Sequence, residues 1–424
     1  MSEAPDPRSK GRSRRFLFAA LYFSEGAPIG YIWWALPTKL RAAGVPIERI
    51  TQLTALLILP WALKFLWAPV IDSLPFPRLT RHSGMDHCGA VVHGFVASSV
   101  VVPWSRGALR LVFIAAVRAR AVCGDTRCRR RFIRDLGDPV RTPWRDQCLD
   151  ASRHACGPAV FGGLGLYVER WIGSQAILAA MLACVWASML LICFADEPCP
   201  CVVATVGADS MRIQGFGNIL KQALKRRATW LGLALAAFGG SAYEALGSVA
   251  GPMLIDHGAG QDAVGLFFAA PAVICMALGA MAGGRIGDQF GRTAAVVGFL
   301  LGIALLTIST AIVLAFVSSY HPLFAALGVL YVLIGGFTAS SYALFMDLTD
   351  PRLGATQFSA FMGATNLCEA WSSLAVGWLI VLVDYPWALC SMVLPTILAA
   401  TLVPQINRQF VADDEDEADG GPAV

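Results

Sequence analysis

Apolar residues in this chain come in runs of about 20, separated by short polar stretches and by glycine and proline. A helix of about 20 apolar residues can cross the hydrocarbon core of a bilayer, which is about 30 Å thick. A shorter run at 158–173 predicts part of one further span. The pattern therefore predicts an all-α polytopic membrane protein, with full spans at 16–38, 50–71, 175–195, 229–251, 264–283, 293–317, 322–346, 357–383 and 386–404.

The composition of the 424 residues supports this prediction. Hydrophobic residues make up 56% of the chain and charged residues 15%, whereas a soluble domain carries about 25% charged residues. A soluble enzyme is therefore excluded. The 12 cysteines are scattered, and several lie inside apolar runs, so a secreted disulfide-rich scaffold is excluded as well.

The second part of the chain repeats the first at an offset of about 215 residues. Pro37 and Gly44, at the end of the first span, correspond to Pro252 and Gly258 at the end of a later one. Two such halves predict a duplicated bundle of six plus six helices. In membrane transporters, halves of this kind enclose a substrate site near the middle of the bilayer.

Positive charge predicts the orientation of the spans. Basic residues crowd the polar segment 1–15, and four more lie between Lys221 and Arg227. By the positive-inside rule both segments face the cytoplasm. The predicted organisation is a tail at 1–15, six-helix halves at 16–196 and 229–404, a cytoplasmic linker at 197–228 and an acidic, disordered tail at 405–424.

Residues 79–157 differ in composition from the rest of the chain. They hold five of the 12 cysteines, four of the six histidines and 13 arginines, without an apolar run long enough to span. A zinc module would use such residues, but their spacing matches no CxxC pair or finger. A nucleic-acid-binding insert needs aromatic residues among the arginines, and between Arg127 and Arg145 only Phe132 and Trp144 are available.

A shifted reading frame is the interpretation that we favour for this segment. One permitted set of codons for Asp146 to Pro158, read from the second base, encodes an apolar helix that continues into the following span. The restored helix would correspond to Gln357 to Leu367 in the second half of the repeat. The same shift can also turn Val117 to Arg130 into a helix-like run. Residues 79–157 as written are then expected to specify no native structure. About spans three to five are disrupted in that case, and the protein as written could be inactive.

Ionisable residues inside spans are costly, so each is a candidate functional group. Glu25 lies among Gly26, Pro28 and Gly30, which loosen the helix and can free backbone groups for a polar substrate. Glu244 occupies roughly the equivalent place in the second half. We expect these carboxylates to bind protons or substrate; a hydrogen bond to a neighbouring helix is the alternative role.

Two further residues complete this set. Glu369 lies in a later span, and Lys64 lies about two turns inside the second. Lys64 could pair with a carboxylate, bind an anionic substrate or extend its ammonium group to the cytoplasmic edge.

A third group of residues predicts gating. In the segment Gly284 to Arg292, a Gly-xxx-Asp step is expected to allow a close helix approach, while Gly291 turns the chain and Arg292 offers a charge partner. Such a cluster can hold one conformation and release it in another; an ordinary polar turn is the alternative. The predicted gating residues are Asp72, Gly284, Asp288, Gly291, Arg292, Asp347, Asp350 and Arg352.

Aromatic residues near span ends are expected to anchor the protein at the membrane interface rather than to stack on sugars. They are Tyr31, Trp33, Trp34, Trp61 and Trp67. No motif in the sequence indicates a metal or another cofactor.

These motifs resemble the major facilitator superfamily, and within it the branch of AmpG-type muropeptide permeases and acetyl-coenzyme A transporters. The segment Gly284 to Arg292 is similar to the superfamily's loop signature, except that Gln289 replaces the usual basic residue. The branch resemblance lies in Tyr22 to Pro28, Leu63 to Pro69 and Gly354 to Phe358.

The resemblance implies cytoplasmic termini, twelve helices and proton-driven import of anhydro-muropeptides across a bacterial inner membrane. We therefore expect a symporter that contacts lipid, a small solute and protons, acts as a monomer and binds no nucleic acid. Transport of an acyl-coenzyme A or a sugar conjugate is one alternative, and a non-transporting signalling protein is another. A membrane-embedded transferase would need a polar catalytic cluster, and the sequence shows none.

Overall fold

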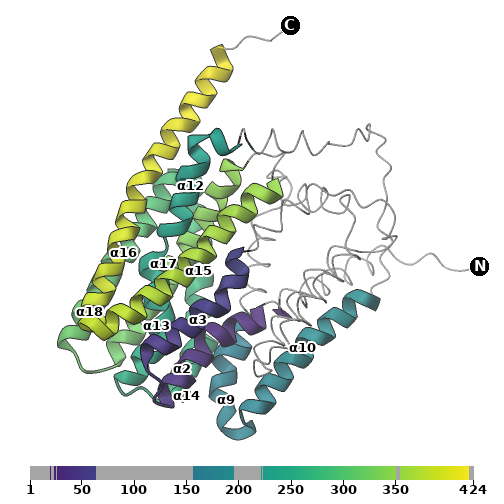
Figure 1. The fold of residues 1–424 in the computed structure, drawn as a ribbon, viewed down its shortest axis with the longest axis vertical. Coiled ribbons are helices and arrows are strands. Elements are labelled where there is room, and N and C mark those ends of the chain that lie inside the picture. Colours follow the sequence, from purple (N-terminus) through teal and green to yellow (C-terminus); the bar gives the residue numbers. More distant parts are fainter. Residues whose placement is uncertain are drawn as a thin grey trace, which may run out of the picture. The chain divides into compact units, whose positions relative to one another are not determined.

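The computed structural model describes residues 20, 23–24, 26–63, 156–194, 221, 223–349 and 354–419, and every regular element among them is a helix (Figure 1). The chain divides into two compact units: unit 1 comprises 1–31 and 74–210, and unit 2 comprises 32–73 and 211–424. Several predicted features lie outside the described residues: Glu25, Lys64, Asp72, Asp350, Arg352 and positions 79–155 of the segment with the proposed frame shift.

Unit 1 contains the start of the first predicted span and, among its described residues, two later ones. The partial span at 158–173 forms η3 (Ala159–Leu164, a π-helix) and α9 (Gly165–Ile172), and the next forms α10 (Ser174–Phe194). The first of these crosses the helix around Gly26 at very short range. A Cβ atom on Gly157 would lie 2.8 Å from the backbone of Gly26 and overlap that of Phe23, so only glycine fits at the crossing.

The helix around Gly26, Pro28 and Gly30 continues in place of breaking. Its α-helical turns pass into the π-helix η1 (Tyr31–Ala35), followed by α2 (Leu36–Ala42). The loosening of the chain expected here therefore takes the form of a wider helical turn. Single π-helical turns of this kind occur frequently at functional sites.

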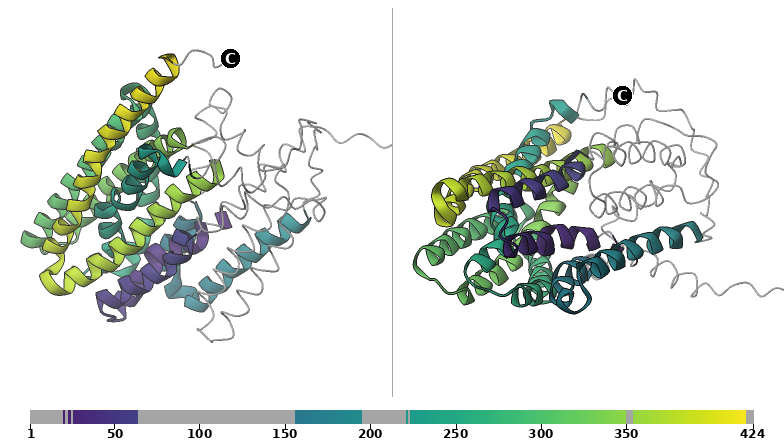
Figure 2. Two further views of the ribbon diagram at one scale, coloured as in Figure 1. Left: turned by 45° about the horizontal axis from the view of Figure 1, so that its top comes forward. Right: turned by 60° about the horizontal axis from the view of Figure 1, so that its bottom comes forward.

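Unit 2 contains the predicted spans from 229 to 404 as helices α12 to α18, which pack alongside one another (Figures 1 and 2). Asp384, with φ 62°, interrupts α18 between the two spans predicted at 357–383 and 386–404. The helices are α3 (Ile47–Ala62), α12 (Arg227–Phe238), α13 (Ser241–Asp256), α14 (Gln261–Ala269), α15 (Pro271–Phe290), α16 (Arg292–Phe316), α17 (His321–Leu348) and α18 (Gly354–Asp419).

The geometry at two helix ends matches the sequence repeat. Gly44 follows α2 with φ +83°, and Gly258 follows α13 with φ +87°. Both positions need the left-handed backbone conformation that glycine adopts without strain. The paired glycines of the repeat therefore end corresponding helices in the same way.

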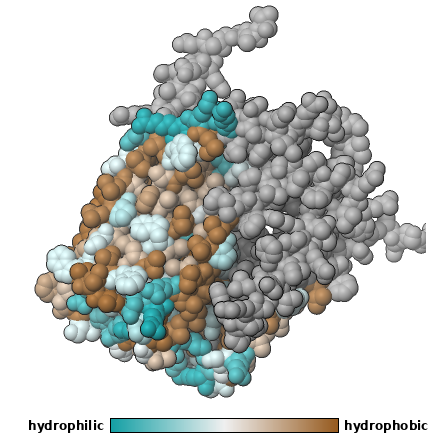
Figure 3. Space-filling model, in the orientation of Figure 1, coloured by the Kyte–Doolittle hydropathy of each residue, from teal (hydrophilic) through white to brown (hydrophobic). Residues whose placement is uncertain are grey.

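Five of the described helical segments are long and apolar enough to cross a membrane, between Arg227 and Ile406. On the face drawn in Figure 3, hydrophobic side chains cover the flank of unit 2 and hydrophilic ones gather at its two ends. This distribution is the one that a bilayer requires of a membrane-spanning bundle.

Glycines allow α15 and α17 to pack backbone against backbone. A Cβ atom on Gly279 would overlap the carbonyl oxygen of Val332, and one on Gly283 would lie 2.5 Å from the backbone of Gly336. A Cβ on Gly284 would meet nothing within 4 Å. The close approach expected at Gly284 is therefore made by Gly283, because one step along a helix turns a side chain by about 100° to another face.

A buried glutamine fixes the start of α18, where the span predicted at 357–383 begins. Gln357 donates hydrogen bonds to the Thr229 hydroxyl at 3.2 Å and to the Leu348 carbonyl at 3.1 Å. It thereby joins α12, α17 and α18. This contact gives a structural role to the segment Gly354 to Phe358, on which the family resemblance partly rests.

The C-terminal part of α18 extends past the other helices of unit 2 (Figure 1). The sequence predicts a disordered tail at 405–424, whereas the helix continues to Asp419. Residues 405–419 contain no glycine and no proline, so nothing in that stretch forces the helix to end.

Candidate functional site

Two of the predicted carboxylates lie close enough to interact inside unit 2. Glu369 on α18 is 9% accessible, and Glu244 lies half-buried in the first turn of α13. The two groups are within range of direct electrostatic interaction. We call Glu244 and Glu369 the carboxylate pair.

Local structure explains where each carboxylate lies. A turn at Gly239 and Gly240 separates α12 from α13, and the backbone of Gly240 accepts a hydrogen bond from the Glu244 amide at 2.9 Å. Trp33, in the π-helical turn η1, donates a hydrogen bond to Glu369. The pair is therefore positioned by three segments that are far apart in the sequence.

Aromatic side chains on α17 lie near the carboxylate pair. Tyr331 and Tyr342 on α17 both interact electrostatically with Glu244. Trp34 donates a hydrogen bond to Tyr331 at 3.0 Å and stacks on Phe268 at 5.1 Å. Trp34 is only 3% accessible, so its expected role as an interface anchor is wrong. The π-helical turn alters the register of the side chains, which a period of 3.6 residues does not anticipate.

Neither carboxylate of the pair forms an ion pair with another described residue. The described residues also contain no group of three or more histidine, cysteine or acidic side chains that could hold a metal ion. The charge of the pair is thus balanced by no described basic side chain. Such a site can bind protons or a solute with a positive or hydrogen-bonding group.

The predicted gating segment forms an ion pair with the other predicted gating cluster. Gly291, with φ +89°, turns the chain between α15 and α16. Arg292 then pairs with Asp347 and donates a hydrogen bond to the Ala343 carbonyl at 3.3 Å. Asp288 is exposed and has no ion-pair partner among the described residues. The Arg292–Asp347 pair joins α16 to α17, both in the C-terminal half.

A second polar cluster, which the sequence analysis missed, joins α2, α13 and the break in α18. Arg41 Nε donates to Asp256 Oδ1 at 2.6 Å, and the Tyr385 hydroxyl donates to Asp256 Oδ2 at 2.7 Å. The hydrogen bond to Asp256 raises the pKa of Arg41, and burial raises the pKa of Tyr385. Both groups therefore keep their protons at neutral pH, where each donates a hydrogen bond to Asp256.

The repeat contains the signal that could have found this cluster. Arg41 and Asp256 are 215 residues apart, which is the offset that relates Pro37 to Pro252. Opposite charges at equivalent positions of a two-fold repeat can meet near the axis. Composition and hydropathy alone carry no such information.

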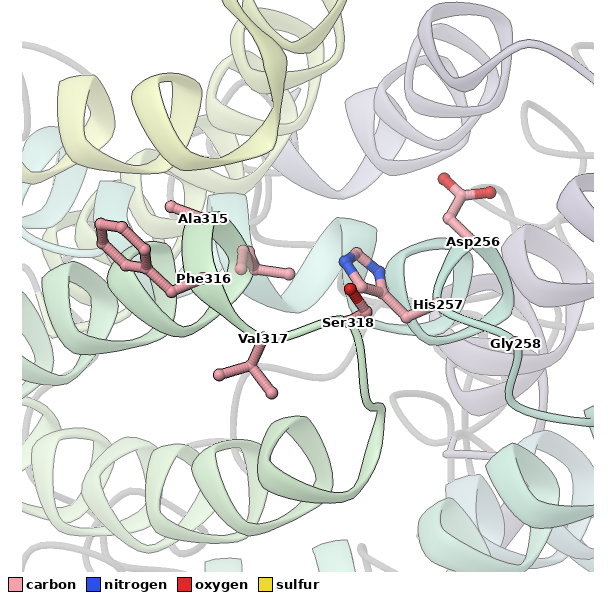
Figure 4. A pocket seen from close by; sticks show the side chains of 8 residues that line it. Asp256, His257, Gly258, Ala315, Phe316, Val317 and Ser318 are labelled. Carbon is pink, nitrogen blue, oxygen red and sulfur yellow. The ribbon is translucent and has the colours of Figure 1, made fainter.

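The two ion pairs lie at opposite ends of unit 2. Arg292 is the first residue of α16, and a 25-residue helix is about 37 Å long. The last turn of α16, up to Phe316, lines a hollow of about 460 Å³ together with Asp256 and His257 (Figure 4). The Arg41–Asp256 end is thus a bilayer thickness away from the Arg292–Asp347 end.

Comparisons with known proteins bear on the fold. No family model matches the chain. The crystal structure of the nucleoside transporter NupG has a TM-score of 0.61 and 12% sequence identity, over 92% of this chain and 99% of that one. The human organic anion transporter MFSD10 has a TM-score of 0.59 and 14% identity, over 94% and 100%. At such low identity, these likenesses show the fold alone.

Proposed function

We propose that this chain, which has the six-plus-six helix-bundle fold of the major facilitator type, is a secondary active transporter that works by alternating access. The observation that carries the proposal is the carboxylate pair, a buried Glu369 beside a half-buried Glu244, which lies in a bundle of membrane-spanning helices without a described basic partner. Retaining such a costly group inside a membrane indicates a function.

The carboxylate pair is proposed to couple solute movement to protons. Two carboxylates in a low-dielectric site repel each other when both are charged. A proton or a polar solute relieves that repulsion, and access from alternate sides of the membrane then moves both. Glu25 and Lys64 are proposed to take part in the same site, on the basis of the sequence alone.

Gating is proposed for the ion pair of Arg292 and Asp347 with Gly291 at the turn. The pair lies within one half, so it braces α16 against α17 while that half moves. Its side chains are 41% and 42% accessible, and an exposed pair contributes about 0–1 kcal/mol. The other gating residues, proposed from the sequence, are Asp72, Gly284, Asp288, Asp350 and Arg352.

The proposed substrate is an anhydro-muropeptide, taken from the family resemblance. An acyl-coenzyme A or a sugar conjugate is the alternative solute, and the two structural relatives add nucleosides and organic anions to the classes worth testing. The proposed location is a bacterial inner membrane, with both termini in the cytoplasm and the protein acting as a monomer.

Uptake into proteoliposomes separates a carrier from a signalling protein. The full chain is reconstituted and given radiolabelled anhydro-muropeptide, acetyl-coenzyme A, a nucleoside and an organic anion, each with and without an inward proton gradient. We expect gradient-dependent accumulation of one class. Saturable binding of a solute without accumulation would instead support the signalling alternative.

We further propose that residues 79–157 result from a shifted reading frame. Resequencing the DNA across these codons is expected to show two compensating small insertions or deletions. If the corrected frame encodes apolar spans, transport is measured on the corrected chain. If neither shifted frame encodes apolar spans, the frame proposal is wrong and the segment is a genuine insert.

A further inference from the structure

Three helix ends meet at Asp256. The carboxylate accepts hydrogen bonds from Arg41 at the end of α2 and from Tyr385 at the break in α18. Arg41 Nη1 also donates to the Val45 carbonyl at 3.1 Å, which fixes the turn between α2 and α3. Tyr385 follows Asp384, whose positive φ is rare outside glycine. The Asp256 carboxylate therefore binds the turn between α2 and α3 as well as the break in α18.

Helices of the two halves also pack closely at two glycines in this part of unit 2. A Cβ atom on Gly251 would overlap the Thr38 hydroxyl, so α13 and α2 touch without a gap. A Cβ atom on Gly377 would overlap the Thr51 hydroxyl, and Ser373 donates to the Thr51 carbonyl at 3.4 Å. Thus α2 and α3 of the first half lie directly against α13 and α18 of the second.

This seam joins the two halves of the repeat. Arg41 and Thr38 belong to the first half, and Asp256 and Gly251 to the second. Any motion that separates the halves at this end must break the Arg41–Asp256 ion pair. The Arg292–Asp347 pair, by contrast, lies within one half and is unaffected by such a motion.

We propose that Arg41, Asp256 and Tyr385 form a latch that holds α2 of the first half against α13 and α18 of the second in the described conformation, and that opens when the halves separate. The latch rests on the proposed alternating-access function. Its charged and hydrogen-bonded partners come from three helices. Because each half contributes one charge, the latch engages only when the halves meet.

Chemical labelling at Thr38 tests the latch without requiring transport. Thr38 is fully buried beneath the latch, so a cysteine there is reachable only when the seam opens. In the Thr38→Cys chain, reconstituted in vesicles, the rate of labelling by a membrane-impermeant thiol reagent is measured against the same chain without that cysteine. Asp256→Asn and Arg41→Gln are each expected to raise this rate at least about threefold, and Tyr385→Phe to raise it less.

Two controls make the test specific. Arg49→Gln removes an exposed charge eight residues from Arg41 and is expected to leave the labelling rate unchanged. The exchanged pair Arg41→Asp with Asp256→Arg is expected to restore part of the protection, because the ion pair returns while the hydrogen bond from residue 41 to the Val45 carbonyl is lost. Circular dichroism and the gel-filtration profile establish that each variant is folded.

The outcomes separate the latch from the proposed function. Labelling that Asp256→Asn does not change, or that Arg49→Gln raises equally, would overturn the latch. Rates that rise in the single variants and stay high in the exchanged pair would also overturn it. If labelling responds as expected but the chain accumulates no solute, the latch is supported. Only the proposed transport function is then contradicted.

Discussion

Replacing Glu369 by glutamine is expected to lower proton-driven solute uptake about 5–150-fold, the range that corresponds to a coupling free energy of about 1–3 kcal/mol. Glutamine has nearly the same shape but cannot bind or release a proton. Because a carboxamide resembles the protonated acid, exchange of labelled for unlabelled solute should persist in the variant. The measurement is uptake and exchange in the same proteoliposomes.

Glu48→Gln provides the matched control for this prediction. Glu48 lies partly exposed in the first turn of α3, so its loss is expected to leave both uptake and exchange unchanged. Glu244→Gln should behave like Glu369→Gln. If proton-driven uptake is unaltered in both variants, the carboxylate pair does not couple solute movement to protons.

Replacing Gly279 by alanine is expected to destabilise the bundle. The new methyl group would overlap the Val332 carbonyl oxygen, which is backbone and cannot rotate away. Overpacking of this kind costs about 1–3 kcal/mol. Gly284→Ala, on the same helix, meets nothing within 4 Å and should be neutral or stabilising by about 0.5–1 kcal/mol, because alanine favours the helix.

The test is the difference between the two substitutions in their effect on the melting temperature. Apparent melting temperatures of the purified full chains are compared at one scan rate, since membrane proteins often unfold irreversibly. A lower value for Gly279→Ala and an equal or higher one for Gly284→Ala are expected. Equal melting temperatures in the two variants would mean that α15 and α17 do not pack as closely as described.

Hydropathy predicts the helices of unit 2 well because the membrane sets their length. The spans predicted at 293–317 and 322–346 coincide closely with α16 and α17. The gap predicted before Pro386 coincides with the non-helical Asp384. A signal of about 20 apolar residues depends only on bilayer thickness and needs no knowledge of neighbouring helices.

Packing details could not be predicted in the same way, because they depend on the faces that helices present to one another. The close approach at Gly283 in place of Gly284 is one residue away from the prediction. Trp34 is buried against Phe268 and Tyr331, although a tryptophan near a span end usually marks the interface. Trp34 lies within the π-helical turn η1, which changes the register of the side chains, and sequence periodicity does not reveal such turns.

Electrostatic pairs across the repeat were predictable in principle. Arg41 and Asp256 occupy equivalent positions, so aligning the halves and comparing charges would have indicated the contact. Arg292 and Asp347 were each expected to hold a gate, and the structure pairs them with each other. Partners in ion pairs depend on the fold more than on the local motif.

Proton movement that accompanies solute movement tests the central claim most directly. The chain encoded by the verified gene is reconstituted with a pH-sensitive dye inside the vesicles, and the solute identified by uptake is added outside without an imposed proton gradient. Proton-coupled import predicts acidification of the vesicle interior that depends on the solute and is absent in Glu369→Gln. Solute accumulation without any change in internal pH, or acidification without solute, would contradict it.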